Sequence, residues 1–396
     1  MYKTAKNKYS SLKAFARLPL SAKALCVTDA FGMNGVDPGI GASVAAALAW
    51  LCRAQDQSLS RDGRVARHFS ITTGWGASYP ETTGYIVPTM LEGARLFNND
   101  DLRVRAKKML DWLVSIQMEG GGFQGGLIDS TPVVPVTFNT GQILLGLAAG
   151  FKEFGEIYLP AMTKAADWLA QTQDPDGCWR KFSTPFAAAG EKAYETHVSW
   201  GLLEAARLTG NQGHENAALR NIHWALQQQR ENGWFDKCCL IIPEQPLTHT
   251  IGYVLRGVLE GYRYFKDPAL LAAAMKTADG LLNVIDGRGF IPGRLNSDWH
   301  GTVTWSCLTG TVQIAHCWLM LYQETGDVRY RDAAFRANAY VRKTVAIKGN
   351  LDLVGGVRGS FPIFGKYGQF EYLNWACKFF IDSNVYEQTI RKNETC

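Results

Sequence analysis

The sequence predicts an all-α protein with an (α/α)6 toroid fold, in which an outer ring of helices wraps an inner ring. Three observations support this prediction: helical periodicity dominates the 396 residues, amphipathic segments alternate with segments that are apolar almost all round, and the junctions between them repeat a motif. A helix that is apolar around its circumference is normally buried, whereas an amphipathic helix covers a surface. An open solenoid of helical pairs is the alternative architecture.

The amphipathic segments are expected to form the outer ring. They occupy residues 43–57, 101–117, 159–173, 213–230, 268–284 and 329–344. The segments between them are rich in glycine, alanine and large apolar residues, and we expect them to form the inner ring at residues 83–97, 140–154, 198–208, 250–264, 309–324 and 372–383. Six consecutive outer-then-inner pairs match one closed unit.

The junctions repeat a glutamine, a glycine and an aromatic residue. The motif reads "QMEGGGF" at 117–123, "QDPDGCW" at 173–179 and "QRENGWF" at 229–235, with a fainter "DGRGF" at 286–290. The last aromatic-rich segment, "NWACKFF" at 374–380, is expected to seal the ring against the first unit. We find no linker or low-complexity segment, so residues 1–30 are interpreted as an N-terminal extension and residues 31–396 as a single toroid domain.

Composition and charge narrow the function classes. With 46% hydrophobic and 19% charged residues the chain is globular, and a net charge of +5 from scattered Lys and Arg does not indicate a nucleic-acid surface. The nine irregularly spaced cysteines indicate reduced, buried thiols. The absence of a signal-peptide pattern or an apolar span predicts a cytoplasmic protein. The basic N-terminus could contact a membrane surface peripherally, although a solvated helix is the preferred interpretation.

The predicted topology places every long outer-to-inner loop, and every inner-helix N-terminus, at one end of the toroid. A helix N-terminus exposes unpaired N–H groups and about half a positive charge, so a ring of them suits an anionic ligand. The loops at this end carry histidine, tyrosine and other polar residues. We expect catalytic residues among His197, His249, Tyr194 and Asn139, and substrate-binding residues among Tyr79, Glu81, His300, Arg294, Trp305, Tyr367 and Tyr372.

Each candidate also has a structural interpretation. Glu195 or Thr196 could cap the helix that carries His197, Asn139 could itself be an N-cap, and Glu81 follows Pro80 in a first turn where a carboxylate favours the helix dipole. Three further histidines fall within helices and are expected to be structural: His214, His223 and His316.

A saccharide containing uronic acid would use these residue types together. Removing the C5 proton requires a group that neutralises the neighbouring carboxylate, a base such as histidine, and an acid such as tyrosine for the leaving oxygen O4. Loss of O4 is the β-elimination of a lyase, whereas reprotonation from the other face is a C5-epimerisation. A glycoside hydrolase would instead need two carboxylates, for which Glu81 and Glu195 are the candidates. A non-catalytic protein that binds polysaccharide during biosynthesis is the alternative from another class.

Other chemistries have weaker support. "DKCC" at 236–239 with His249 resembles the zinc set of a protein prenyltransferase β-subunit but lacks a partner motif, so no metal or cofactor is expected. The junctions resemble those of squalene and hopene cyclases, yet the acidic Asp-x-Asp-Asp run of those enzymes is missing.

A resemblance to a known family is carried by "YPETTGYIVPTML" at 79–91, by the junctions, and by "GGVRGSFPIFGKYGQFEYLNWACKFF" at 355–380. The chain resembles a bacterial family encoded in exopolysaccharide loci, whose toroid is described as squalene-cyclase- or prenyltransferase-repeat-like. The resemblance covers residues 32–383. More distantly, the toroid is similar to (α/α)6 polysaccharide lyases and to glucuronyl C5-epimerases. That similarity implies Asn139 as carboxylate neutraliser, His197 and His249 as bases and Tyr194 as acid. It implies a lyase that acts on an acidic exopolysaccharide.

Overall fold

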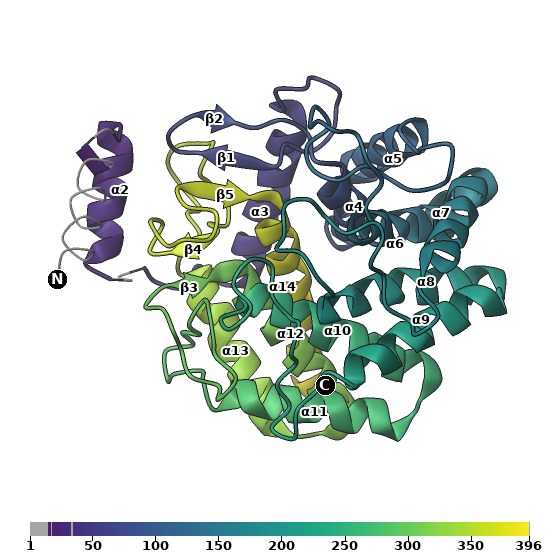
Figure 1. The fold of residues 1–396 in the computed structure, drawn as a ribbon. Helices are drawn as coiled ribbons and strands as arrows, with labels where there is room; N and C mark the ends of the chain where they lie inside the picture. The colour runs from purple at the N-terminus through teal and green to yellow at the C-terminus, as the bar shows by residue number, and fades with distance from the viewer. Residues whose placement is uncertain (1–14, 17, 33–34, 396) are drawn as a thin grey trace, which may run out of the picture.

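Two concentric rings of helices form the body of the molecule (Figure 1). The computed structural model describes residues 15–16, 18–32 and 35–395. The outer ring consists of α3 (Ile40–Asp56), α5 (Asp100–Ser115), α7 (Leu159–Thr172), α9 (Gln212–Leu226), α11 (Pro268–Leu282) and α13 (Val328–Arg342). The inner ring consists of α4 (Pro80–Phe97), α6 (Thr137–Phe154), α8 (Thr196–Thr209), α10 (Thr248–Phe265), α12 (Leu308–Thr325) and α14 (Asn374–Thr395). The predicted (α/α)6 toroid is confirmed.

Short turns join each inner helix to the outer helix that follows it. The chain leaves α4 through Asn98, a left-handed residue with φ 47°, and the Asn99 side chain then caps α5 by accepting from the backbone N–H of Asp101. Gly210, with φ 69°, and Asn211 make the equivalent turn between α8 and α9. The tight pairs are therefore inner-then-outer, the reverse of the predicted pairing, because the long loops precede the inner helices and only the turns after them are short.

The two ends of the chain complete the ring. The last inner helix, α14, packs against the first outer helix, α3, and against the first inner helix, α4. The Asn374 amide donates hydrogen bonds to the carbonyl oxygen of Ala66 and to Thr82 Oγ1, at 3.0 and 2.7 Å. The expectation that the 374–380 segment seals the ring is confirmed.

The side chain of each repeated glutamine links a long loop to the next outer helix by hydrogen bonds, and we call this link a staple. The side-chain amides of Gln117, Gln173 and Gln229 each donate to the carbonyl oxygen of the junction glycine four residues later. Each amide also donates to a backbone carbonyl 44 residues further along the chain, on the next outer helix, at 2.8–2.9 Å. The motif therefore fastens each long loop to the neighbouring unit.

The repeated glycine allows that loop to touch the next outer helix. Gly121, Gly177, Gly233, Gly289 and Gly355 all have positive φ, between 80° and 102°. A Cβ atom at any of them would lie 1.9–2.4 Å from the backbone of the adjoining outer helix. At Gly355 that helix is α3, so the same junction recurs where the ends of the chain meet.

Short strands, absent from the sequence prediction, join the first and last loops. β1 (His68–Ser70) lies between β2 (Gly74–Trp75) and β5 (Glu371–Leu373) in an antiparallel sheet. β3 (Ser306–Cys307) pairs with β4 (Ser360–Phe361). The β1–β5 pairing brings the loop before α14 beside the loop before α4, and the β3–β4 pairing brings it beside the loop before α12, at the end of the toroid where the inner helices begin.

Helix α2 (Leu20–Ala30) lies beside the rings, next to the strands (Figure 1). The buried Asp29 carboxylate binds the Arg358 guanidinium at 2.6 Å and accepts from the backbone N–H of Ile363. The division of the chain at residue 30 stays a prediction. The basic residues 1–14, to which a membrane contact was assigned, lie outside the described residues.

No helix in the described part of the chain is long and apolar enough to span a bilayer. The cytoplasmic location stays a prediction. The described cysteines are free thiols, and all but the half-buried Cys52 are buried, as expected from their spacing.

Candidate active site at the N-terminal end of the inner ring

A cavity of about 480 Å³ lies where the inner helices begin. Its walls come from the first turns of α4, α6 and α10, from the loops before them, and from the region joining β5 to α14. Six of the predicted site residues line it together: Tyr79, Glu81, Asn139, Tyr194, His249 and Tyr367.

The inner helices reach this end of the toroid without side-chain caps. Helices α4, α6, α8, α10 and α12 have no N-cap side-chain hydrogen bond, whereas α5, α9, α11 and α13 are capped by Asn or Asp. The capping interpretations of Asn139 and Glu195 are therefore wrong. Uncapped N-termini leave the positive end of each helix dipole facing this end of the toroid, which favours an anionic guest.

Asn139 presents an unused hydrogen-bond donor. The residue is 2% exposed and lines the cavity, and its Nδ2 makes no hydrogen bond of normal geometry among the described residues, although the amide is near enough to the Tyr79 hydroxyl to offset part of the rise in pKa that burial causes in that group. A buried amide N–H without a partner carries a desolvation cost of about 1–3 kcal/mol, which a ligand oxygen would relieve. Asn139 is therefore placed to bind an oxygen of a guest in the cavity.

His249 lies in the first turn of α10 as a neutral imidazole. Its Nδ1 is 2.6 Å from Gln313 Oε1 on α12, and burial lowers the pKa of the ring to about 4. Because the amide oxygen accepts, the ring proton lies on Nδ1, and Nε2 keeps its lone pair. That tautomer can accept a proton. An anion in the cavity would raise the pKa of the ring toward neutrality.

Glu81 is a buried carboxyl group in the first turn of α4. Tyr79 donates a hydrogen bond to Glu81 Oε2 at 2.8 Å, and burial raises the pKa of the carboxyl group to about 7. A substantial fraction of Glu81 is therefore protonated near neutral pH. In this form it can donate a hydrogen bond or a proton to a guest.

His197 does not line the cavity. It is 1% exposed, and its ring packs against Tyr253 at a centroid distance of 4.6 Å, while His249 packs against the same ring at 4.4 Å. Its Nδ1 is 2.7 Å from Gln142 Oε1, the same kind of pair as His249 makes with Gln313. The structure therefore does not place His197 where it could touch a guest in this cavity, because its ring packs against Tyr253 and its Nδ1 is paired with Gln142. Its neighbour Tyr194, in the 3-10 turn η2 (Ala193–Glu195), does line the cavity.

Two candidates from the loop before β3 also lie elsewhere. Arg294 donates from Nη1 to the carbonyl oxygen of Gln245 at 2.5 Å and pairs in a β-bridge with Leu247, so it holds the loop that leads into α10. His300 is exposed, in a turn closed by Asn296.

Trp305 and Tyr372 are used in packing. A Cβ atom added to Gly293 would lie 2.3 Å from Cζ3 of Trp305, so the Trp305 ring packs directly against this glycine. Tyr372 is a strand residue of β5, and its hydroxyl accepts from Arg358 Nε at 3.3 Å. Neither residue is among those lining the cavity.

The structure adds residues that sequence reasoning missed. Arg67 lies at the cavity, with Nη1 2.9 Å from Glu371 Oε2 and its guanidinium over the Trp375 ring at 5.1 Å. Nothing in the local sequence marks Arg67, because the β1–β5 pairing places it there. Tyr85 and Tyr253 also line the cavity and could have been predicted, since each follows a candidate, Glu81 or His249, by one helical turn.

The carboxylates in the cavity bear on the hydrolase alternative. Among the described residues that line the cavity, Glu81 is the one carboxyl group. Glu195 is 2% exposed and does not line the cavity, and burial raises its pKa to about 8. The described residues contain no group of three or more His, Cys, Asp or Glu side chains placed to hold a metal ion.

Comparison with known proteins gives a sequence match that covers the middle of the chain. Residues 134–256 match the model of the squalene-hopene cyclase C-terminal domain. The squalene–hopene cyclase of Zymomonas mobilis is 29% identical over 170 residues, which are 41% of this chain and 22% of that protein. The chain thus spans less than a quarter of the length of this relative. The family-model match includes the staples at Gln173 and Gln229, so part of the likeness lies in the scaffold.

Solved structures match nearly the whole chain. An unsaturated glucuronyl hydrolase specific for heparin has a TM-score of 0.71 at 15% identity, with 88% of this chain and 97% of that chain covered. The unsaturated glucuronyl hydrolase of Bacillus sp. GL1 has a TM-score of 0.69 at 14% identity, covering 87% and 96%. That of Streptococcus agalactiae has 0.62 at 12%, covering 88% and 90%. The chain is therefore an (α/α)6 toroid similar in structure to unsaturated glucuronyl hydrolases and, over residues 134–256, similar in sequence to the C-terminal domain of squalene-hopene cyclase.

Proposed function

We propose that this protein is an enzyme that acts on a saccharide containing uronic acid, and that it cleaves an acidic polysaccharide by β-elimination, as a polysaccharide lyase. One observation carries the proposal: a neutral imidazole, an unpartnered amide donor and an arginine line the same cavity, at the end of the toroid where the inner helices begin uncapped. The similar solved structures support the substrate class, because they are unsaturated glucuronyl hydrolases.

The substrate carboxylate would be bound first. Arg67 would supply positive charge, and the Nδ2 of Asn139, which makes no hydrogen bond of normal geometry among the described residues, would supply a hydrogen bond. Protonated Glu81 would donate a further hydrogen bond. Together these groups lower the negative charge next to C5 and so acidify the C5 proton.

Proton transfer would follow. Nε2 of His249 accepts the C5 proton, while Gln313 holds the ring in the tautomer that leaves this nitrogen free. Burial raises the pKa of Tyr194 well above its usual value, so its phenol stays protonated and can donate to the departing O4. The C4–O4 bond breaks as the C4–C5 double bond forms, and no cofactor enters this reaction. His197 would not touch the substrate and would instead hold the Tyr253 ring in position through packing.

Hydrolysis of the same class of substrate is the second candidate. Glu81 favours it, because a carboxyl group with a pKa of about 7 is suited to general acid work, and so do the similar structures. The usual hydrolytic mechanism needs two carboxyl groups, and the described residues that line the cavity include one, so the cavity argues against that mechanism. C5-epimerisation would use the same base and the same carboxylate site.

A panel of uronic-acid polysaccharides and oligosaccharides tests the proposal. Elimination produces a conjugated C4–C5 double bond, so ultraviolet absorbance should rise with time. New reducing ends without that absorbance, or loss of absorbance from a substrate already unsaturated, would establish hydrolysis instead. Binding without turnover of any polymer would indicate the non-catalytic role in polysaccharide biosynthesis.

A further inference from the structure

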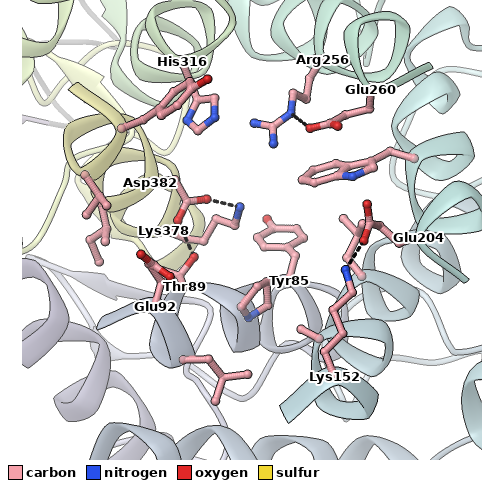
Figure 2. A pocket seen from close by; sticks show the side chains of 18 of the residues that line it. Tyr85, Thr89, Glu92, Lys152, Glu204, Arg256, Glu260, His316, Lys378 and Asp382 are labelled. Carbon is pink, nitrogen blue, oxygen red and sulfur yellow. Dashed lines mark hydrogen bonds and ion pairs between the residues drawn. The ribbon is translucent and has the colours of Figure 1, made fainter. Parts of the chain in front are cut away.

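A second cavity, of about 630 Å³, lies at the opposite end of the toroid. It is lined by residues of the inner helices from their second turn onward, from α4 to α14 (Figure 2). Tyr85 lines both cavities and therefore belongs to the layer of side chains between them. The proposed reaction uses nothing in this second cavity.

Arg256 presents free donors to the second cavity. Its Nε donates to Glu260 Oε1 at 2.7 Å, and its guanidinium stacks over the Trp200 ring at 4.2 Å. The two Nη groups have no hydrogen-bond partner in the part of the chain that the structure describes. Figure 2 shows them directed toward the middle of the cavity. Glu260 and Trp200 therefore hold the Arg256 guanidinium in place and leave its two Nη groups available to a ligand.

Lys378 adds a second buried cation. It is 3% exposed and pairs with Asp382 at 2.5 Å, and Asp382 also accepts from Thr89 Oγ1 at 2.6 Å. An ammonium group has three donors, and this carboxylate occupies one of them. Figure 2 shows Lys378, on α14, and Arg256, on α10, extending into the same cavity.

His316 completes the polar set. Its Nδ1 is buried without a hydrogen-bond partner among the described residues, and its ring stacks on Tyr386 at a centroid distance of 4.9 Å. The Trp200 and Tyr386 rings at the cavity are surfaces of the kind on which the apolar face of a sugar packs.

The rim limits what can enter. Glu92, Glu153 and Glu204 line the outer part of the cavity, where they pair with Arg95 and Lys152. A polyanion that extended past the rim would meet these carboxylates. A small anion at the centre would meet the Nη groups of Arg256 and the ammonium group of Lys378, beside the carboxylates that pair with them, Glu260 and Asp382. We propose that the second cavity is a binding site for a small anion, with a single carboxylate or phosphate group on a hydroxylated ring.

Titration calorimetry of the whole chain tests this proposal with three probes: glucuronate, glucose 1-phosphate and inorganic phosphate, with glucose as the neutral control. We expect the anions to bind and glucose not to bind. Arg256→Gln should weaken this binding at least about tenfold, because it removes charge-assisted hydrogen bonds. Lys378→Met should act in the same direction, and Arg256→Gln remains informative if Lys378→Met does not fold.

A matched variant separates the two cavities. Arg67→Gln, at the first cavity, should leave binding of inorganic phosphate unchanged, and Arg95→Gln should show that the rim contributes little. Binding that is lost in Arg67→Gln but kept in Arg256→Gln would overturn the proposal, as would the absence of binding for all three anions. Because the readout is binding, failure of the proposed elimination reaction would leave this result standing.

Discussion

The carboxyl group of Glu81 holds its proton more tightly in the folded chain than in the unfolded chain. Its pKa is raised from 4.5 to about 7 by burial, and the Tyr79 hydroxyl only partly offsets that effect. Between these two pH values the unfolded chain has released the proton and the folded chain has not. The folded state therefore loses stability as the pH rises through this window.

Glu81→Gln should remove this dependence. Relative to wild type, the variant should gain up to about 3 kcal/mol in the free energy of unfolding between pH 4.5 and pH 8, measured by urea denaturation. Glu195→Gln is the matched control, since Glu195 is also buried, has a pKa raised to about 8, and does not line the cavity. Both variants should change the pH dependence of stability. A Glu81→Gln variant whose stability follows wild type at every pH would contradict this account.

The pH profile of activity distinguishes two roles for Glu81. If protonated Glu81 binds the substrate carboxylate, KM should rise above pH 7 with little change in kcat. If Glu81 is the general acid of a hydrolase, kcat should fall instead. Glu195→Gln should retain the wild-type profile.

At the residue scale, six of the eleven site residues predicted from the sequence line the cavity. Residues in the first turn of an inner helix, such as Asn139 and His249, could be placed because the helix itself aims them at the cavity. Arg67 could not be placed, because strand pairing with a segment some 300 residues away brings it there. His197 was misplaced because one residue of helical rotation turns a side chain by about 100° and so decides which layer it enters.

At the scale of elements, the junction glycine sets how closely a loop approaches the next unit. Gly177→Ala should destabilise the fold by about 2–4 kcal/mol, because the residue has φ 94° and its Cβ would lie 2.4 Å from the carbonyl oxygen of Arg220. Gly210→Ala is the matched control, with φ 69° and no atom within 4 Å of the added Cβ. It should cost about 1 kcal/mol from backbone conformation alone. Equal losses in thermal or urea denaturation would show that the close approach contributes nothing.

The helices were predictable because each follows from local pattern. The all-round apolar segments became the inner ring, and the periodic charged ones the outer ring. The pairing of neighbours could have been predicted as well, because the connections that follow the inner segments are only a few residues long in the sequence. The strands were not predicted, because β1, β2 and β5 have two or three residues each, too few for an alternating pattern of apolar and polar residues.

At the scale of the whole molecule, one buried arginine connects both ends of the chain. Arg342 on α13 binds Asp37, which precedes α3, at 2.8 Å, and Glu387 on α14 at 3.0 Å. The Glu387 side chain is fully buried. The ring therefore closes through a charged network as well as through apolar packing.

Arg342→Met should destabilise the chain by about 3–5 kcal/mol, because it leaves buried carboxylate charge without one of its partners. Adding Glu387→Gln in the same chain should recover part of that loss. Arg329→Met, on the exposed face of the same helix, should cost less than about 1 kcal/mol. Denaturation curves for the three variants that show equal losses would refute a role for Arg342 in closing the ring.

The account as a whole depends on proton removal from C5 by His249. The most direct measurement follows a uronate oligosaccharide in D2O by NMR, with wild type, His249→Ala and His223→Ala, whose histidine is exposed on α9. Wild type and His223→Ala should form the unsaturated product, and His249→Ala should slow its formation by about 10²–10⁴-fold. Cleavage that yields saturated ends, with no deuterium at C5 and with full activity in His249→Ala, would contradict the proposed elimination.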